Sequence, residues 1–273
     1  MTVEELIIYG KQFVHSTHAK MILADLLGVN SLELLNYLKQ KVEEEIVNNY
    51  KQRINALKEK KPIQYVIGNV NFYGNQFKVN ENVLIPRFET EELVENTLNY
   101  IEEIFPSNNL KVIDLGTGSG CIGITLKKKN SLLDVTLLDI SKEALEVAKE
   151  NATNLQTEVT LIQNDMLENL IDKYDVIISN PPYIKENEEI EEIVKNNEPH
   201  LALYAGIDGL DCYKKILKEA PNHINDKFLI ALEIGESQKE DIIRLAEEIF
   251  PNAVMDSKKD LQGRDRMIFI YQK

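Results

Sequence analysis

Four consecutive residues near the middle of the chain carry the groups needed to bind a planar NH₂ group. Asn180, Pro181, Pro182 and Tyr183 follow the apolar run 174–179. The prolines have no backbone N–H and a fixed φ, so the neighbouring carbonyls stay free to accept hydrogen bonds. The Asn180 side-chain oxygen and the Pro181 carbonyl can each accept one hydrogen of the NH₂ group, and the Tyr183 ring can stack on its flat face. The alternative is a proline-rich turn without a ligand.

This arrangement suits the transfer of a methyl group to an amide or aryl amine nitrogen. Such a nitrogen is a poor nucleophile because its lone pair is delocalised. Two acceptors on its hydrogens favour electron density on the nitrogen. Holding the nitrogen in line with the methyl carbon and its leaving group then accelerates the transfer by orientation. The nitrogen becomes acidic as the methyl group arrives, so the pattern requires no strong general base.

A glycine-rich turn and a later aspartate indicate a cofactor with a ribose. The turn comprises Gly116, Thr117, Gly118, Ser119 and Gly120. Glycines there accept positive φ and allow a ligand to approach the backbone, and the helix that follows offers free N–H groups. Asp139 ends the next apolar run, nineteen residues after Gly120, where a carboxylate can bind both hydroxyls of a ribose.

The turn by itself fits two cofactors. Residues 118–123 also satisfy the G-x-G-x-x-G pattern of nicotinamide dinucleotide sites. Asp114 stands just before the glycines, where an acid suits a ligand with a cationic amino group. S-adenosylmethionine has such a group and nicotinamide dinucleotides do not, so Asp114 and the motif 180–183 together favour S-adenosylmethionine.

The elements that must position these residues alternate between strands and helices after residue 111. The predicted strands are 112–115, 135–139, 159–162, 176–179, 228–233, 253–255 and 267–271, and the predicted helices between them are 122–128, 142–151, 213–223 and 239–250. This alternation predicts an α/β fold in which a mostly parallel sheet carries helices on both faces.

The region before residue 90 divides into two parts. Residues 1–61 carry helical periodicity, with Gly28 as a predicted helix end and Ser31 as a predicted helix cap. Short apolar runs at 65–67, 70–73, 77–79 and 83–85 predict a hairpin, after which Thr90 opens another helix. We therefore expect a small helical domain over 1–61, a β-hairpin linker over 62–88 and a catalytic domain over 89–273.

The composition excludes several classes of protein. Thirty-one basic and 45 acidic residues give a net charge of −14, which counts against binding to DNA through its phosphates. The two cysteines make neither a disulfide framework nor a zinc site, and we expect no metal. There is no secretory signal and no apolar run of about 20 residues, so we expect a cytoplasmic protein without a membrane anchor.

Together these motifs resemble the HemK/PrmC family, the peptide chain release factor glutamine N5-methyltransferases. The resemblance covers nearly the whole chain and rests on residues 84–91, 114–120, 180–183, 198–199, 202–203, 208–210, 232–235 and 260–261, with Gly263 and Arg266. The chain departs from the family at Phe88, where a second proline is usual.

The resemblance implies a Rossmann-like, S-adenosylmethionine-dependent methyltransferase with a seven-stranded, mostly parallel sheet, preceded by a helical domain that docks the substrate. It implies that Gly116–Gly120, Asp139, Met166 and Asn180 bind S-adenosylmethionine. It also implies that Asn180–Tyr183 bind the glutamine of the Gly-Gly-Gln motif in release factors, with Asn180, Pro181 and Tyr183 acting in catalysis.

Two other substrates remain as alternatives at this point. A glutamine of a ribosomal protein poses the same chemical problem as the glutamine of a release factor. DNA adenine N6-methyltransferases share an Asn/Asp-Pro-Pro-Tyr motif, but they also need a basic groove and a route for flipping the base. The helical domain and the motif 84–91 favour release factors.

Overall fold

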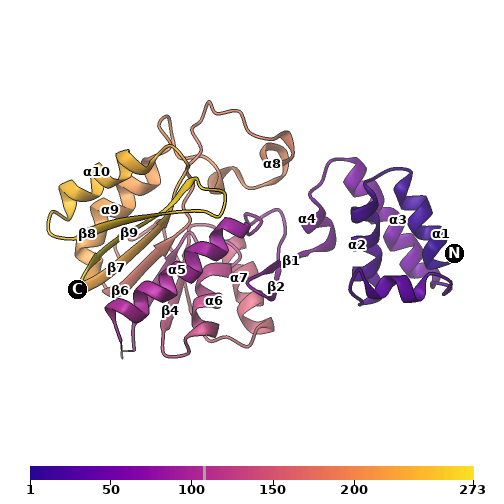
Figure 1. The fold of residues 1–273 in the computed structure, drawn as a ribbon, viewed down its shortest axis with the longest axis horizontal. Helices are drawn as coiled ribbons and strands as arrows, with labels where there is room; N and C mark the ends of the chain where they lie inside the picture. Colours follow the sequence, from indigo (N-terminus) through magenta and orange to yellow (C-terminus); the bar gives the residue numbers. More distant parts are fainter. Residues whose placement is uncertain (107–108) are drawn as a thin grey trace. The chain divides into compact units, whose positions relative to one another are not determined.

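The computed structural model describes residues 1–106 and 109–273 and divides into two compact units. The first unit comprises Met1–Asn69 and Ile190–Asn197, and the second comprises Val70–Glu189 and Glu198–Lys273. Each unit has its own apolar core, and the two are described separately below. Figure 1 gives the labels of the elements.

The first unit is helical. Its elements are α1 (Val3–Lys11), α2 (Ser16–Leu27), the 3₁₀ helix η1 (Glu33–Tyr37), α3 (Glu44–Lys58), α4 (Ile63–Ile67) and α8 (Glu192–Asn197). Leu6, Ile22 and Tyr50 are fully buried where α1, α2 and α3 pack together. Gly28 ends α2 with a φ of 64°, as predicted. The prediction for Ser31 was wrong, because the Asn30 side chain accepts the N–H groups of Leu32 and Glu33 instead.

The segment expected to be a β-hairpin contains less strand than predicted. Residues 65–67 belong to helix α4, which begins after Pro62 and ends at Gly68 with a φ of 90°. Tyr65, Val66 and Ile67 pack against the helical core or lie buried, so tertiary contacts favour the helix over their strand propensity. The hairpin itself is β1 (Asn69–Phe72) and β2 (Asn75–Lys78). Residues 83–85 form no strand, although Val83 and Ile85 are buried.

The second unit is built on a sheet of seven strands in the order β5-β4-β3-β6-β7-β9-β8. The strands are β3 (Lys111–Leu115), β4 (Asp134–Asp139), β5 (Thr160–Gln163), β6 (Tyr174–Ser179), β7 (Ile224–Glu233), β8 (Val254–Lys259) and β9 (Asp265–Gln272). The first five in that order are parallel, and β9 is antiparallel to both β7 and β8. Each predicted strand overlaps one of these, so the prediction of a seven-stranded, mostly parallel sheet is confirmed.

Helices cover both faces of the sheet (Figure 1). They are α5 (Phe88–Ile104), α6 (Cys121–Lys129), α7 (Lys142–Asn154), α9 (Asp211–His223) and α10 (Lys239–Ile249), with a short 3₁₀ helix η2 (His200–Ala202). On β3, Val112 faces the core shared with α5, α6 and α7, whereas Ile113 faces the core shared with α9 and α10. Burial of both faces explains why these strands read as continuous apolar runs.

The strand order brings the predicted site residues to one edge. Leu115 at the end of β3 pairs with Leu138 of β4 on one side and with Ser179 of β6 on the other. The glycine turn, Asp139 and Asn180 follow these three positions directly, so they lie at the carboxyl ends of adjacent strands. Within residues 1–106 and 109–273, no helix is long and apolar enough to cross a membrane.

Candidate active site

A cavity of about 440 Å³ lies at the carboxyl edge of the sheet, within the second unit. Its volume falls in the usual range for small-ligand sites. Eight of the predicted site residues line it: Gly116, Thr117, Gly118, Ser119, Asp139, Met166, Asn180 and Pro182. Three others, Gly120, Pro181 and Tyr183, are described by the structure but lie outside its lining.

The glycine turn gives the cavity a wall of bare backbone. Gly116 and Gly118 have φ of 66° and 55°, which only glycine adopts readily. A Cβ at either position would have no heavy atom within 4 Å, so the backbone there borders open space. Gly120 has a different role, because a Cβ there would lie 2.7 Å from Ile124 Cδ1. It allows α6 to pack closely rather than forming part of the wall.

Asp114 stands behind the turn and not in the wall of the cavity. Its Oδ2 accepts hydrogen bonds from Thr117 Oγ1 at 2.6 Å and from the Gly123 N–H at 3.0 Å. Its Oδ1 is buried without a hydrogen-bond partner in the described part of the chain. Burial raises the pKa of Asp114 to about 7, against the lowering effect of these two hydrogen bonds. Asp114 therefore holds the shape of the turn, and it lies outside the cavity lining.

Asp139 joins two walls of the cavity. Its Oδ2 accepts the Gly118 N–H at 2.8 Å, and its Oδ1 accepts the Ser141 N–H at 2.9 Å. Burial raises the pKa of Asp139, and the hydrogen bonds from these backbone groups oppose that rise. Each carboxylate oxygen has a further lone pair, so Asp139 can still accept hydroxyl groups from a ligand.

Met166 reaches the cavity through an unusual backbone conformation. Its φ is 51°, in the left-handed region that non-glycine residues seldom adopt. The Asn164 side chain stabilises this conformation by donating to the carbonyls of Met166 at 3.0 Å and Glu168 at 2.6 Å. The half-buried Met166 side chain packs beside the core of the α9 face.

The segment 180–183 is held by side chains from distant elements. Asn180 Nδ2 donates to Thr90 Oγ1 over 3.1 Å. The Tyr183 carbonyl accepts a hydrogen bond from Gln238 Nε2 at 3.0 Å, and Gln238 Oε1 accepts the Gly235 N–H at 2.9 Å. The Tyr183 ring packs against the core of the α9 face, and burial raises the pKa of its hydroxyl. Gln238 and Thr90 were not among the predicted site residues.

A partly buried ion pair connects two segments that border the cavity. Glu198 Oε1 accepts a hydrogen bond from Arg87 Nη2 at 2.5 Å, and Glu198 Oε2 accepts the Ile85 N–H at 3.1 Å. The Glu198 side chain is only 2% exposed. Residues on both sides of this contact, including Leu84, Pro86 and Leu201, line the cavity.

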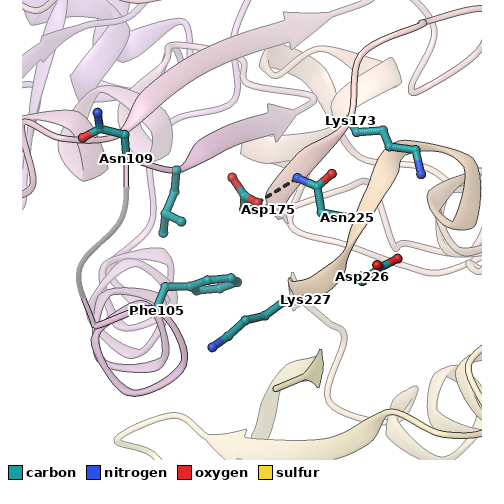
Figure 2. Close-up of a pocket in the computed structure, with 8 residues that line it drawn as sticks. Phe105, Asn109, Lys173, Asp175, Asn225, Asp226 and Lys227 are labelled. Carbon is teal, nitrogen blue, oxygen red and sulfur yellow. Dashed lines mark hydrogen bonds between the residues drawn. The ribbon is translucent and has the colours of Figure 1, made fainter.

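A second hollow of about 520 Å³ lies at the opposite end of the sheet (Figure 2). It is lined by Phe105, Asn109, Leu110, Lys173, Asp175, Asn225, Asp226 and Lys227. Asn225 Nδ2 donates to Asp175 Oδ1 at 2.8 Å, so two of its polar groups already satisfy each other. Ligands of parallel sheets bind at the carboxyl ends of the strands, which favours the first cavity as the active site.

Two family models match this chain. Residues 15–68 match the model of the PrmC N-terminal domain, and residues 88–202 match the model of the methyltransferase small domain. These two regions contain most of the helical unit and most of the residues that line the cavity.

Curated relatives match over nearly the whole chain. A release factor glutamine methyltransferase of Bacillus cereus is 44% identical over 255 residues, which cover 92% of this chain and 90% of that protein. A protein of the same name from Streptococcus pneumoniae is 39% identical over 98% of this chain and 94% of its own length. The solved structure of a methyltransferase from Pyrococcus furiosus shares the fold, with a TM-score of 0.53 at 16% identity over 82% of this chain and 98% of that one.

Proposed function

Because this chain belongs to the family of release factor glutamine methyltransferases, we propose that it transfers a methyl group from S-adenosylmethionine to the side-chain amide nitrogen, N5, of a glutamine. The glutamine is the one in the Gly-Gly-Gln motif of peptide chain release factors. The observation that carries this proposal is the single cavity in which the glycine turn, Asp139 and Asn180 meet. One wall suits the cofactor, and the adjacent wall suits a planar amide.

The residues of the cavity fit S-adenosylmethionine. The bare backbone at Gly116 and Gly118 leaves room for the methionine end, and the free lone pairs of Asp139 suit the ribose hydroxyls. Met166 offers an apolar surface to the adenine. When bound, S-adenosylmethionine supplies an electrophilic methyl group on a sulfonium.

The acceptor wall positions the substrate amide and stabilises it during transfer. Asn180 Oδ1 and the Pro181 carbonyl accept the two hydrogens of the glutamine NH₂ group, which keeps electron density on its nitrogen. Pro182 lines the cavity beside them. The Tyr183 ring, which packs against the core of the α9 face outside the cavity lining, is proposed to stack on the amide plane of the bound substrate. Orientation of the nitrogen by these fixed groups is the main source of the rate enhancement.

The helical unit is proposed to dock the release factor. It exposes several large apolar side chains, among them Ile8 at 55%, Leu32 at 81% and Leu35 at 56%. We expect Leu32→Asp combined with Leu35→Asp to raise the KM for an intact release factor, with kcat and activity on a short Gly-Gly-Gln peptide unchanged. Ile171→Asp, at a residue that is 95% exposed in the second unit, is the matched control. An unchanged KM in the double variant would refute the docking role.

A substrate panel tests the proposed reaction directly. The protein is incubated with methyl-labelled S-adenosylmethionine and, separately, with a release factor, ribosomal proteins and duplex DNA, and the labelled residue is mapped by mass spectrometry. We expect label on the Gly-Gly-Gln glutamine and none on a release factor carrying alanine there. Label on a ribosomal protein or on adenine alone would replace this function with one of the alternatives. Because the proposed substrate works in translation termination, we propose that the protein acts in the cytoplasm.

A further inference from the structure

Two buried residues outside the predicted site are connected to Asn180 by consecutive hydrogen bonds. Asn180 Nδ2 donates to Thr90 Oγ1 over 3.1 Å, and Thr90 Oγ1 donates to Glu233 Oε2 over 2.7 Å. Thr90 and Glu233 are each only 2% exposed. Thr90 lies in the first turn of α5, and Glu233 is the last residue of β7. Three elements that are distant in sequence therefore meet at the Asn180 side chain.

The chemistry of these groups determines which way the Asn180 amide faces. A carboxylate can only accept hydrogen bonds, so the hydroxyl of Thr90 uses its single hydrogen on Glu233. Thr90 then has only lone pairs left to offer, and the group of Asn180 that faces it must be the NH₂. The oxygen and nitrogen of an amide have nearly the same shape, so packing alone would not select this orientation.

We propose that Thr90 and Glu233 are positioning residues that hold the Asn180 amide with its oxygen available to the acceptor glutamine. This inference rests on the proposed function, in which Asn180 Oδ1 accepts a hydrogen from the substrate NH₂. In the reversed orientation Asn180 would present its own NH₂ to the substrate NH₂. Two donors would then face each other, and the substrate nitrogen would lose one of its two acceptors.

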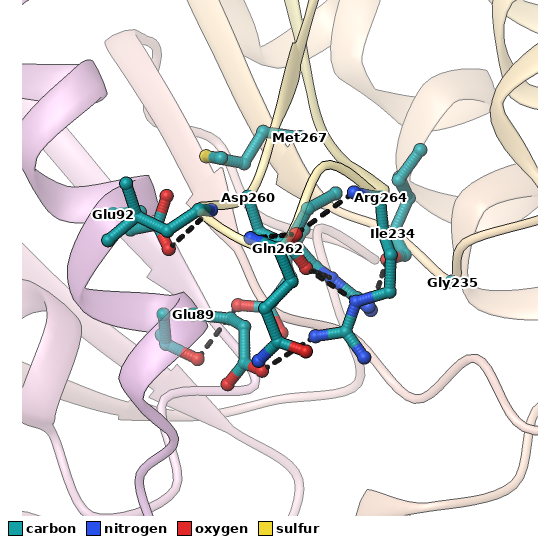
Figure 3. A network of polar contacts seen from close by, with 12 residues as sticks. Glu89, Glu92, Ile234, Gly235, Asp260, Gln262, Arg264 and Met267 are labelled. Atoms are coloured by element: carbon teal, nitrogen blue, oxygen red, sulfur yellow. Dashed lines mark hydrogen bonds and ion pairs between the residues drawn. The ribbon is translucent and has the colours of Figure 1, made fainter.

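A network of charged residues fixes the backbone on both sides of this pair (Figure 3). Arg266 Nη1 donates to the carbonyl of Ile234, the residue after Glu233, at 3.0 Å. Arg264 Nη2 donates to Glu89 Oε1, on the residue before Thr90, at 3.0 Å. Asp260 accepts hydrogen bonds from both arginines, at 2.9 Å and 3.3 Å. The network therefore holds the ends of α5 and β7 in a common frame.

The two hydrogen bonds that connect Asn180, Thr90 and Glu233 also predict that turnover depends on pH. Burial is the main cause that raises the pKa of Glu233 to about 7, while the hydrogen bond from Thr90 and the charge of Arg266 lower it. The charges of Arg87, Glu89 and Arg266 affect the pKa of Glu233. The charge of Glu233 in turn affects the pKa values of Tyr183, Tyr213 and Cys121. A protonated Glu233 can donate to Thr90 Oγ1 and so release the hydrogen of Thr90. The Asn180 amide can then flip, so that its Oδ1 accepts this hydrogen and no longer faces the substrate. Turnover should therefore rise as the pH increases through about 7.

Three variants of the full-length enzyme, together with a control, test the positioning role. Thr90→Val should lower kcat by about 10- to 100-fold, as expected for a misoriented catalytic group, with the KM for a release factor little changed. Thr90→Ser keeps the hydroxyl and should recover most of this loss. Glu233→Gln cannot ionise, so it should lose the rising limb of the pH profile near pH 7.

Thr97→Val is the matched control. Thr97 is fully buried on the same helix, and its hydroxyl donates to the Leu93 carbonyl at 2.7 Å instead of to the site. Thr97→Val should keep the wild-type kcat, although its melting temperature should fall about as much as that of Thr90→Val. A Thr90→Val enzyme with the kcat of Thr97→Val would overturn the proposal. A pH limb that persists in Glu233→Gln would overturn the part played by Glu233.

A measurement without the substrate separates this inference from the proposed function. In protein labelled with ¹⁵N-asparagine, the side-chain NH₂ signals of Asn180 are identified by their loss in Asn180→Ala. Their hydrogen exchange should be slower in the wild type and in Thr90→Ser than in Thr90→Val. Equal exchange rates would refute the bond between Asn180 and Thr90, whichever protein is methylated. If the Asn180 NH₂ hydrogens exchange slowly but the enzyme does not methylate release factors, the positioning role stands and only the proposed function is rejected.

Discussion

Replacing Asn180 with alanine should abolish most methyl transfer while leaving the cofactor wall of the cavity intact. Asn180 follows the last residue of β6 and is only half-buried, so its side chain contributes little to the core. Among the described residues its side chain bonds to Thr90, which keeps its own bond to Glu233 in the variant. Losing a single bond of this kind costs about 1 kcal/mol of folding stability. Losing a fixed acceptor in the transition state costs about 3–4 kcal/mol, or roughly 10²–10³ in rate.

The assay for Asn180→Ala separates chemistry from binding. Single-turnover transfer of a labelled methyl group to a release factor measures the chemical step, and calorimetry measures the affinity for S-adenosylmethionine. Asn225→Ala is the control, because Asn225 donates to Asp175 at the opposite end of the same sheet. We expect a large loss of turnover, with modest changes in the affinities for S-adenosylmethionine and for the release factor. Near-normal turnover in Asn180→Ala would show that the methyl-accepting group binds elsewhere.

Three further changes test other parts of the structure. Asp139→Ala should weaken binding of S-adenosylmethionine by about 1–3 kcal/mol in calorimetry, and an unchanged affinity would remove Asp139 from the site. Glu233 holds a proton in the folded state between its ordinary pKa of 4.5 and about 7, so its burial makes stability fall as the pH rises through that interval. Glu233→Gln should remove on the order of 3 kcal/mol of that fall in urea unfolding at pH 5 and pH 8, and the same pH dependence in both proteins would contradict this reading. Phe88 is 62% exposed and is the first residue of α5, where proline fits, so Phe88→Pro should stabilise the protein by about 0.4–1 kcal/mol. A lower melting temperature in Phe88→Pro would show that the Phe88 N–H or side chain has a structural partner.

Local patterns predicted the sheet and the conformation of the glycine turn well. Each strand of the second unit is an apolar run that ends in a turn, and both its burial and its ends are visible in the sequence. The glycine turn was predictable because positive φ at Gly116 and Gly118 demands glycine. The meeting of this turn with Asp139 and Asn180 followed from a general rule, that parallel strands bring their carboxyl ends to one edge.

The predictions failed where tertiary contacts outweigh local preference. Residues 65–67 have strand propensity, but Val66 and Ile67 pack against the core of the helical unit. Pro62 and Gly68 permit a short helix between them. Val83 and Ile85 are apolar because they are buried, not because they form a strand. Asp114 lies outside the cavity lining because of the path of the turn, which no local pattern specifies.

The support of Asn180 was also beyond the reach of sequence patterns. Thr90 lies 90 positions before Asn180, and Glu233 lies 143 positions after Thr90. Both belong to motifs that the resemblance had marked, at 84–91 and 232–235, but motif membership does not show which side chains bond to each other. The orientation of an amide depends on a chain of donors and acceptors that exists only in the folded protein.

The position of β9 between β7 and β8 has a consequence for the synthesis of the chain. During translation β8 emerges before β9, yet every pairing described for β8 is with β9. Until β9 arrives, β8 has no place in the sheet, and the nascent chain exposes the free edge of β7, whose residues 228–233 are apolar except for Glu233. Such an edge can recruit other chains. A ribosome that stalls before residue 265 should therefore yield an aggregation-prone fragment, which a chaperone would have to cover until synthesis resumes.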